Sequence, residues 1–580
     1  MTAPKGRAAD WTEERQERGT SDLRDEGRRQ GKREWGGGWG PGGAREQSSA
    51  HPLAGTGTLA KLALRRDRIF LVIWVYALVG SLASTTYSYH HLFTAAGERA
   101  SLAHSILANP SFLALSGPVY GDSLGALIVW KAGLFIAVGA GLLGIFAVIR
   151  HTRADEEAGR LELVGATVVG RFAALAAALA VTIGACLVVG LLLAVVQIAF
   201  RLPAAGSLAL GAATALAGCM FAGVAAVTAQ LTESARTARG MAISVLGLAY
   251  LLRAVGDPAP ALSWLSWVSP LGWIERVQPY DGPRWWLLLV CAAVTVALAA
   301  AAAVLAGRRD LGAGLVPARP GRPDAAGWLR SPLTLAWRLQ RGGLAGWMLA
   351  FALSAAVLGA AAKGIGATLN SSPQARTDIL RAGGHTGLVD AYLAIEFALL
   401  SVMAAAFGVA TVLRLHADEA EGRAEAMLAG PVSRIRWAAA EVVWAMGGIA
   451  LLMALAGVCS GLGYGARTGA IGPEVARQLA AALAQVPAAW VLAGLAVALV
   501  GLAPRVTVAA AWTVLAVVAL VDLLGRSLGL SQWVLDLTPF AHVPALPGGT
   551  FTATPLIWLT VVAAGLAVAG LAAFRRRDLT

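Results

Sequence analysis

Residues 134–163 read LFIAVGAGLLGIFAVIRHTRADEEAGRLEL, an apolar run that ends at Arg150 and is followed at once by a segment rich in acids and arginines. About 20 apolar residues in a helix are enough to cross the hydrocarbon core of a bilayer. The stretch therefore predicts a membrane-spanning helix with a charged loop at one end. Both features recur elsewhere in the chain.

The composition of the whole chain points the same way. Of its 580 residues, 57% are hydrophobic and only 14% are charged, whereas typical soluble domains carry about 25% charged residues. A soluble fold this poor in charge could not cover its own surface, which argues against a water-soluble enzyme. The apolar residues form twelve blocks, at 69–88, 124–149, 172–199, 206–230, 237–255, 284–307, 342–362, 390–413, 436–462, 478–502, 506–525 and 555–574.

These blocks should all be helices, because an unpaired backbone cannot face lipid. The sequence thus predicts an all-α polytopic membrane protein with about 12 transmembrane helices. Residues 1–54 differ: they are densely charged and then glycine-rich, with no apolar signal segment, which predicts a disordered cytoplasmic tail.

The arginines and lysines predict the orientation. If the N-terminus is cytoplasmic, the short cytoplasmic flanks hold 25 Lys and Arg residues, without the 10 in the tail, and the outer segments hold 11. Cytoplasmic loops of membrane proteins carry this excess of positive charge. We therefore expect a multi-pass protein of the plasma membrane with both termini in the cytoplasm, and we read the net charge of +13 as a topology signal rather than as a sign of nucleic-acid binding.

The chain contains an internal repeat, whose clearest trace is the charged loop. The loop after the second predicted span (150–171) and the loop after the eighth (414–434) agree at eight positions when 263 is subtracted: Asp155/Asp418, Glu156/Glu419, Gly159/Gly422, Arg160/Arg423, Glu162/Glu425, Ala166/Ala429, Val169/Val432 and Arg171/Arg434. The sequence Arg-Arg-Asp-Leu also occurs twice, at 308–311 and 576–579.

An even number of spans in each repeat gives both the same orientation, which predicts two parallel pseudo-repeats of six helices. The predicted halves are 55–312 and 313–580. We interpret each repeated loop as a short amphipathic helix, in which Glu156 and Arg160, like Glu419 and Arg423, have the i,i+4 spacing of helical ion pairs.

Two interpretations of the loops are open. A solvated connection that only sets topology explains the arginines, but acids contribute little to topology. It therefore leaves the recurring acids and the repeated Gly-Arg-x-Glu core unexplained, which favours a protein-docking role.

The ATP-binding P-loop motif needs a lysine followed by Ser or Thr, and none of the chain's five lysines is followed by either. If ATP drives this protein, a partner polypeptide binds the ATP.

The stretch from Asp155 to Leu163 and its echo from Asp418 to Glu425 resemble the permease subunit of bacterial ATP-binding-cassette exporters with the type-II exporter fold. Within that group the chain, from about residue 55 to 580, is similar to the fused twelve-span permeases of actinobacteria that export polyketide antibiotics or several drugs. The echo is imperfect, because Ala420 replaces Glu157.

This resemblance implies that the chain is a transport subunit rather than an enzyme. Each repeated loop would be a coupling helix that docks into one ATPase subunit, with two ATPase copies for one permease. ATP and magnesium would bind to those partners, this chain would hold no cofactor, and the cargo would be lipophilic. The ATPase-coupling residues would be Asp155, Glu156, Gly159, Arg160, Glu162, Asp418, Glu419, Gly422, Arg423 and Glu425. The lead-ins Leu59 to Arg68 and Leu333 to Arg341 would be elbow helices on the inner leaflet.

Two charged residues lie inside predicted spans, where charge is rare and often functional. Lys131 and Glu396 occupy near-equivalent places in the two repeats, so they could form an ion pair that gates the pathway or contacts cargo. The alternative is that each reaches the outer interface and is hydrated there. No catalytic or metal-binding motif is evident.

Two other classes of protein remain as alternatives. A proton-coupled carrier of the major-facilitator type also has twelve spans in two parallel halves, but its loop signature places Arg after Asp, and here Glu156 follows Asp155. A membrane enzyme acting on lipid-linked substrates would need a cluster of polar catalytic residues, and the outer segments contain none.

Overall fold

The computed structural model describes residues 51–577 except 166–168, 311, 317–323, 325, 370–386 and 525–529. Within these residues, all regular secondary structure is helical. The chain is thus an all-α polytopic membrane protein, as its composition predicts. The predicted disordered tail lies almost entirely outside the described residues.

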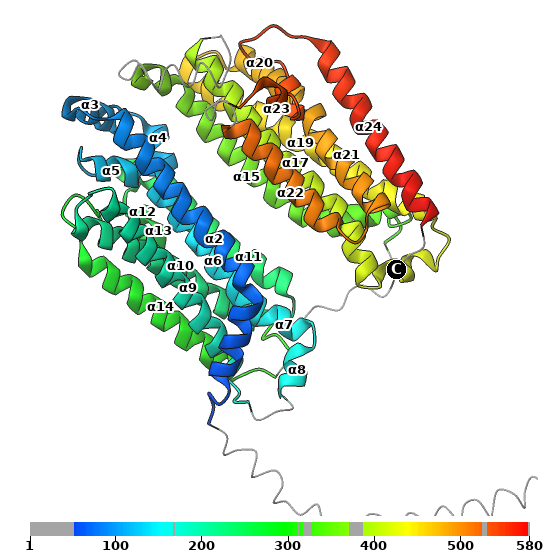
Figure 1. Ribbon diagram of the computed structural model, residues 1–580, viewed down its shortest axis with the longest axis horizontal. Helices are drawn as coiled ribbons and strands as arrows, with labels where there is room; N and C mark the ends of the chain where they lie inside the picture. Colours follow the sequence, from blue (N-terminus) through cyan, green and yellow to red (C-terminus); the bar gives the residue numbers. More distant parts are fainter. Residues whose placement is uncertain are drawn as a thin grey trace, which may run out of the picture.

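The helices form two groups (Figure 1). The first group consists of α2 (Thr56–Leu92), α3 (Ala96–Leu107), α4 (Pro110–Ser116), α5 (Leu124–Ile128), the π-helical turn η2 (Val129–Gly133), α6 (Leu134–His151), α7 (Arg153–Glu157), α8 (Arg160–Gly165), α9 (Ala173–Ala199), α10 (Ala204–Leu231), α11 (Ala235–Gly256), η3 (Pro260–Leu262), α12 (Trp264–Val268), α13 (Pro270–Glu275) and α14 (Trp285–Ala306). The second consists of α15 (Pro332–Leu369), α17 (Leu388–Ala420), α18 (Arg423–Leu428), α19 (Arg434–Thr468), α20 (Ile471–Ala484), α21 (Val486–Leu502), α22 (Thr507–Leu524), α23 (Gln532–Leu535), η4 (Pro539–His542) and α24 (Ala553–Arg576).

All twelve predicted spans coincide with helices. Eleven helical stretches in the described part of the chain are long and apolar enough to cross a membrane. The remaining span, predicted at 506–525, corresponds to α22, which is apolar but shorter. Hydrophobic length located the helices, because an isolated apolar segment of about 20 residues can pair its own backbone groups in lipid only as a helix.

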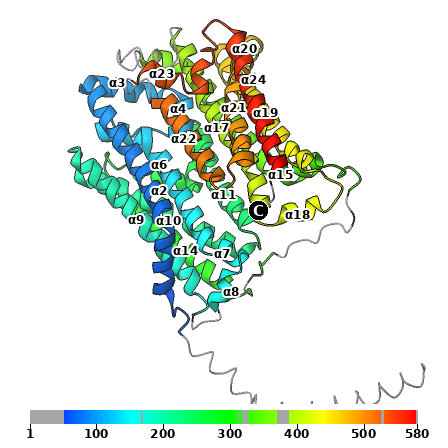
Figure 2. The same cartoon turned by 45° about the vertical axis from the view of Figure 1, so that its right-hand side comes forward.

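Close packing in both groups depends on glycines at helix crossings. In the first group α10 lies between α9, α6 and α14 (Figure 2). A Cβ atom on Gly211 of α10 would lie 2.2 Å from the carbonyl oxygen of Gly190 on α9. In the second group α21 packs along α24, and a Cβ atom on Gly501 would lie 2.2 Å from the carbonyl oxygen of Gly570. Small residues let membrane helices approach this closely.

The predicted elbow helices are not separate elements. The lead-in from Leu59 to Arg68 is the first part of the 37-residue helix α2, and the lead-in from Leu333 to Arg341 begins the 38-residue helix α15. The prediction of a separate helix there is wrong. No Gly or Pro stands between the first lead-in and its apolar span, and in the second the helix continues through Gly342 and Gly343.

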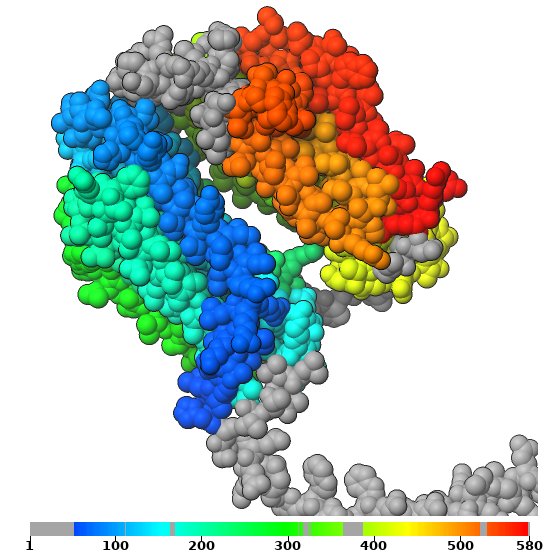
Figure 3. All heavy atoms as spheres, viewed as in Figure 1, coloured from blue at the N-terminus to red at the C-terminus, as the bar shows by residue number. Residues whose placement is uncertain are grey.

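The two groups meet at one end of the molecule and separate at the other. Their contacts concentrate where α3 and α4 meet α15. The opposite end, which we call the loop end, carries α7, α8 and α18 (Figure 2), and there the groups diverge (Figure 1). The space-filling view shows an open gap between them that widens toward the loop end (Figure 3).

Candidate functional site

The two repeated loops share a backbone turn. In the first loop, α7 ends at Glu157, Gly159 has a φ of 69°, and α8 begins at Arg160. In the second, α17 ends at Ala420, Gly422 has a φ of 72°, and α18 begins at Arg423. Positive φ is easily reached only by glycine. The repeated Gly-Arg pair therefore encodes a left-handed break between two helices.

This break corrects the predicted pairing of charges. The i,i+4 pairs of Glu156 with Arg160 and of Glu419 with Arg423 do not form, because the glycine interrupts the helix between them. Each arginine instead folds back over the turn to an aspartate. The Arg160 Nη1 atom lies 2.7 Å from Asp155 Oδ1, and the Arg423 Nη2 atom lies 2.6 Å from Asp418 Oδ1.

The first loop is also tied to the start of α2. Arg66 donates hydrogen bonds of 2.9 Å to both carboxylate oxygens of Asp155. One residue along α2, the buried carboxylate of Asp67 accepts a 2.5 Å hydrogen bond from His151 and lies 3.1 Å from Arg150. The lead-in thus anchors the first loop through two adjacent charged side chains.

The glutamates of the repeat bind the end of the last long helix in their own group. Arg309, three residues beyond α14, donates hydrogen bonds of 2.8 and 3.0 Å to the two carboxylate oxygens of Glu156. In the second group Arg577, the residue after α24, forms an ion pair with Glu419. The two repeated motifs, separated by about 150 residues of sequence, therefore meet in each group.

The last repeated arginine of each loop makes a second link to the same place. Arg171 donates hydrogen bonds to the carbonyl oxygens of Ala306 and Gly307, the latter at 2.9 Å, and of Arg309. Arg434 donates a 3.0 Å hydrogen bond to the carbonyl oxygen of Arg577. The carbonyl groups at a helix C-terminus lack intrahelical partners and carry partial negative charge. These arginines satisfy them.

Burial divides the ten predicted coupling residues into two sets. The side chains of Glu156 and Glu419 are each only 6% exposed, whereas those of Arg160 and Arg423 are 56% and 53% exposed. The exposed members of the repeat, which we call the loop faces, are Arg160 and Glu162 in the first loop and Gly422, Arg423 and Glu425 in the second, with Gly159 half-buried at the turn.

The structure does not join Lys131 to Glu396. Lys131 lies in the π-helical turn η2 of the first group with an exposed side chain, and Glu396 lies in α17 of the second group, only 3% exposed. No ion pair connects them within the described part of the chain. A role of either residue in the pathway or its gate stays a prediction.

Glu396 sits in an unusual environment. Neither of its buried carboxyl oxygens has a hydrogen-bond donor among the described residues. The Ser460 hydroxyl lies beside this carboxyl group, and its oxygen likewise has no hydrogen-bond partner among the described residues. Subtracting 263 relates Ser460 to Gln197 of the first group, whose side-chain oxygen accepts a 2.8 Å hydrogen bond from Thr86.

A charged cluster that the sequence did not indicate lies at the far end of the first group. The fully buried guanidinium of Arg253 bonds to Glu275 at 3.0 Å, to Asp257 at 3.4 Å, and to the carbonyl oxygens of Leu113, Ala114 and Leu115. Burial raises the pKa of Glu275 well above its ordinary value, although Arg253 acts in the opposite direction. The cluster joins α4, α11 and α13.

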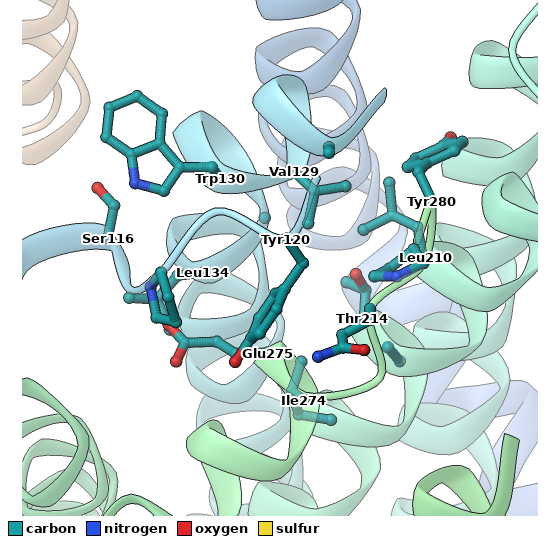
Figure 4. A pocket seen from close by; sticks show the side chains of 16 residues that line it. Ser116, Tyr120, Val129, Trp130, Leu134, Leu210, Thr214, Ile274, Glu275 and Tyr280 are labelled. Carbon is teal, nitrogen blue, oxygen red and sulfur yellow. The ribbon is translucent and has the colours of Figure 1, made fainter. Parts of the chain in front are cut away.

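A small cavity adjoins this cluster (Figure 4). It has a volume of about 40 Å³ and is lined by Tyr120, Trp130, Thr214 and Glu275, among others. Burial raises the pKa of Tyr120 to about 12. Sites for drug-sized ligands occupy about 300–1,000 Å³, so this cavity suits a few water molecules rather than cargo. Trp130 Nε1 and Glu275 Oε2 have no hydrogen-bond partner among the described residues, and they are the polar groups that such water would satisfy.

A larger, apolar groove of about 740 Å³ runs between α10, α11 and α14 on the loop-end side. Val224, Val227, Leu231, Val245 and Leu298 form most of its apolar wall. Its volume lies in the range of sites for drug-sized molecules. Within the described residues, no group of three or more His, Cys, Asp or Glu side chains is arranged to hold a metal ion.

Comparison with known proteins identifies the family. A family model described as the multidrug efflux system permease Rv1217c, C-terminal domain, matches residues 57–306 and 329–575. The multidrug efflux system permease protein Rv1217c of Mycobacterium tuberculosis (strain ATCC 25618 / H37Rv) is 44% identical over 544 residues, which cover 93% of this chain and 98% of that protein. The chain belongs to the Rv1217c family of multidrug efflux permeases.

For this efflux permease, sequence reasoning missed the partners of the loop acids. Arg309 and Arg577 stand in a repeated motif, but their positive charge alone suggested only topology. Arg66 has no counterpart in the second lead-in, where Leu339 follows Arg338, so the repeat could not reveal it. Arg253 lies near the end of a span, and its burial was not evident from its position.

Proposed function

We propose that this permease is the membrane subunit of an ATP-driven exporter and that its two loop faces dock separate ATPase subunits, one copy on each. ATP and magnesium bind to those partners, since the chain itself lacks a P-loop lysine motif. The observation that carries the proposal is that the repeat presents the same exposed charges twice, on two loops at the same end of the molecule.

The chemistry of the loop faces suits a protein partner. The exposed guanidinium groups of Arg160 and Arg423 can fork onto carboxylates. The side chains of Glu162 and Glu425 are exposed and have no ion pair or hydrogen bond within the described residues. An unpaired acid beside an arginine at the same place in both loops is available to a partner, whereas the buried Glu156 and Glu419 are not.

This proposal also sets the orientation. ATP is a cytoplasmic substrate, so the loop end faces the cytoplasm, and the excess of Lys and Arg on the same flanks supports that assignment. Both termini then lie in the cytoplasm of a cell whose plasma membrane holds the protein.

The cargo fits the apolar surfaces that the structure presents. The gap between the two groups opens at the loop end (Figure 3), and the groove between α10, α11 and α14 has an almost entirely apolar lining. Lipophilic molecules match such surfaces. We propose that they enter from the cytoplasmic leaflet and leave at the end where α3 and α4 meet α15.

Reversing the charge of both loop faces tests the docking. The permease with Glu162→Arg and Glu425→Arg should reach the membrane in normal amounts, because neither side chain has an ion pair or hydrogen bond to lose among the described residues. It should retain at least tenfold less ATPase subunit on purification and lose ATP-dependent transport of a lipophilic dye into inverted vesicles.

The matched control is Glu98→Arg, an exposed acid on α3 at the opposite end. It should leave both ATPase binding and transport unchanged. Normal binding of the ATPase to the doubly reversed permease would refute docking through the loop faces.

A further inference from the structure

Each repeated loop is held at both of its ends by the terminus of the last long helix in its group. We call this arrangement the clasp. In the first group it consists of the bonds of Glu156 to Arg309 and of Arg171 to the carbonyl groups at 306, 307 and 309. In the second it consists of the bonds of Glu419 to Arg577 and of Arg434 to the carbonyl group at 577.

The clasp is not a chance surface contact. The Glu156 and Arg309 side chains are 6% and 8% exposed, and those of Glu419 and Arg577 are 6% and 14% exposed. Surface ion pairs of exposed side chains contribute little and vary easily. A desolvated pair differs, since removing one partner leaves an uncompensated buried charge. The same desolvated pair occurs in both groups, between residues that the repeat makes equivalent.

The clasp also connects each loop to a long helix of its own group. The loop faces stand on α7, α8 and α18, which are too short to hold their own position. Ion pairs at the start of each loop and backbone hydrogen bonds at its end connect it to the ends of α14 and α24. Both helices are long and apolar enough to cross the membrane. A displacement of a loop face would therefore displace the end of a membrane helix with it.

We propose that the clasp transmits the movement of the docked ATPase to α14 and α24, with Arg309 and Arg577 as positioning residues that make each loop and its helix move as one body. This inference rests on the proposed function. It gives both repeated features of the sequence a role. The acidic loop supplies the glutamate of each clasp, and the Arg-Arg-Asp-Leu motif supplies the arginine.

The two clasps differ in their surroundings. In the first, the fully buried guanidinium of Arg153 also binds Glu156, and it donates a 2.7 Å hydrogen bond to the carbonyl oxygen of Ala313. Arg309 donates 2.7 and 3.0 Å hydrogen bonds to Gln230 Oε1 and to the same Ala313 carbonyl oxygen. These added bonds fix the chain that leads toward the second group. The second clasp has fewer such partners, so a substitution there affects the clasp with fewer effects on other hydrogen bonds.

The test is a charge-swap series in the complex of permease and ATPase. Arg577→Glu places two carboxylates together and opens the second clasp. The loop face at Arg423 and Glu425 is unchanged, so the ATPase should still copurify and still hydrolyse ATP. Cargo transported per ATP hydrolysed should fall at least tenfold. Arg577→Glu with Glu419→Arg restores an ion pair and should recover at least half of the wild-type ratio.

The matched control is Arg576→Glu, the neighbouring exposed arginine, which should leave the ratio unchanged. If Arg577→Glu fails to accumulate in the membrane, Glu419→Gln removes the attraction without adding repulsion and should show the same loss of coupling with the ATPase bound.

The outcomes distinguish this inference from the docking proposal. If Arg577→Glu transports a normal amount of cargo per ATP, the clasp is not a transmission element. The same holds if the charge swap fails to restore a lowered ratio. In both cases, continued binding of the ATPase supports the docking proposal. Transport by wild-type permease with no ATPase attached overturns the docking and the clasp together.

Discussion

At the scale of single residues, the repeated loops show how one short motif combines different duties. In both loops the aspartate binds the arginine across the glycine turn. The glutamate that follows the aspartate, Glu156 or Glu419, is buried against the end of the last long helix. The glutamate after the turn, Glu162 or Glu425, is exposed. Neighbouring acids of the same charge therefore have different physical environments, and only the exposed ones can meet a partner.

The glycine of the turn gives the first prediction. Gly422 has a positive φ, and a Cβ atom added to it would meet no atom of the described residues within 4 Å, so its requirement is conformational rather than steric. Replacing it by Ala should cost about 1–2 kcal/mol in the loop, the usual cost of a left-handed residue with a Cβ atom. We expect Gly422→Ala to weaken ATPase binding about 5- to 30-fold, measured by titration of the ATPase onto purified permease.

Gly430, eight residues further along, supplies the control. It lies in the same loop without a positive φ, and Gly430→Ala should bind the ATPase like the wild type. Equal weakening by both substitutions would contradict the conformational explanation.

The buried carboxyl group of Glu396 gives the second prediction. An ionised carboxylate without hydrogen-bond donors is costly to bury, so the site is suited to a neutral side chain of the same shape. Glu396→Gln should therefore change the free energy of unfolding by less than about 1 kcal/mol, measured by thermal unfolding in detergent. Glu396→Lys, which buries a charge at the same place, should lower the melting temperature clearly. A large loss of stability in Glu396→Gln would show that the negative charge itself is required.

At the scale of helices, the sequence located the elements well because the requirement that places them is local. Apolar runs such as that of 172–199 must be helical in lipid, and α9 spans Ala173–Ala199. The sequence predicted separate lead-in helices where the structure has one continuous helix, as in α2 and α15. It predicted one loop helix where the glycine at 159 divides the loop into two.

The crossing of α21 and α24 gives the third prediction. A Cβ atom on Gly570 would lie 2.5 Å from the backbone carbon and oxygen of Val497, so Gly570→Val forces the helices apart. Overpacking of this kind costs about 1–3 kcal/mol or more, which should appear as a lower melting temperature of the purified protein. Gly565, on the same helix with nothing within 4 Å of a Cβ atom, is the control. Equal destabilisation by Gly565→Val would mean that helix propensity rather than the crossing is responsible.

At the scale of the whole molecule, the arrangement of the two groups determines what the loops can do. The groups meet through α3, α4 and α15 at one end and are apart at the loop end (Figures 1 and 3). Two docked partners that approach each other would draw the loop ends together around the contact at the far end.

This geometry gives the fourth prediction. Arg65 and Arg338 are exposed residues near the starts of α2 and α15, and each stands nine residues before a tryptophan, Trp74 or Trp347. Spin labels at these two positions should move closer when ATP and vanadate trap the closed ATPase, and pulsed dipolar spectroscopy measures the change. A label pair at Arg65 and Arg201, both exposed in the first group, should keep its distance. Active transport with no change between Arg65 and Arg338 would refute closure at the loop end.

The site was only partly predictable. The repeat relates the loops 150–171 and 414–434, and in the structure both contain a glycine turn, at Gly159 and Gly422. It could not separate Glu156, buried against Arg309, from Glu162, which is exposed. Nor could it show that Lys131 and Glu396, at near-equivalent positions, form no ion pair in the described structure.

The sequence alone determined that this chain is a helical membrane protein, where its long helices lie and that its loops repeat, because hydrophobic length and recurring residues are properties of adjacent positions. Only the tertiary structure decided which arginine each acid binds, which loop charges stay exposed and where the two groups touch. Those features depend on side chains that the fold brings together from distant parts of the chain, and the burial that gives an ion pair its strength exists only once the helices have packed.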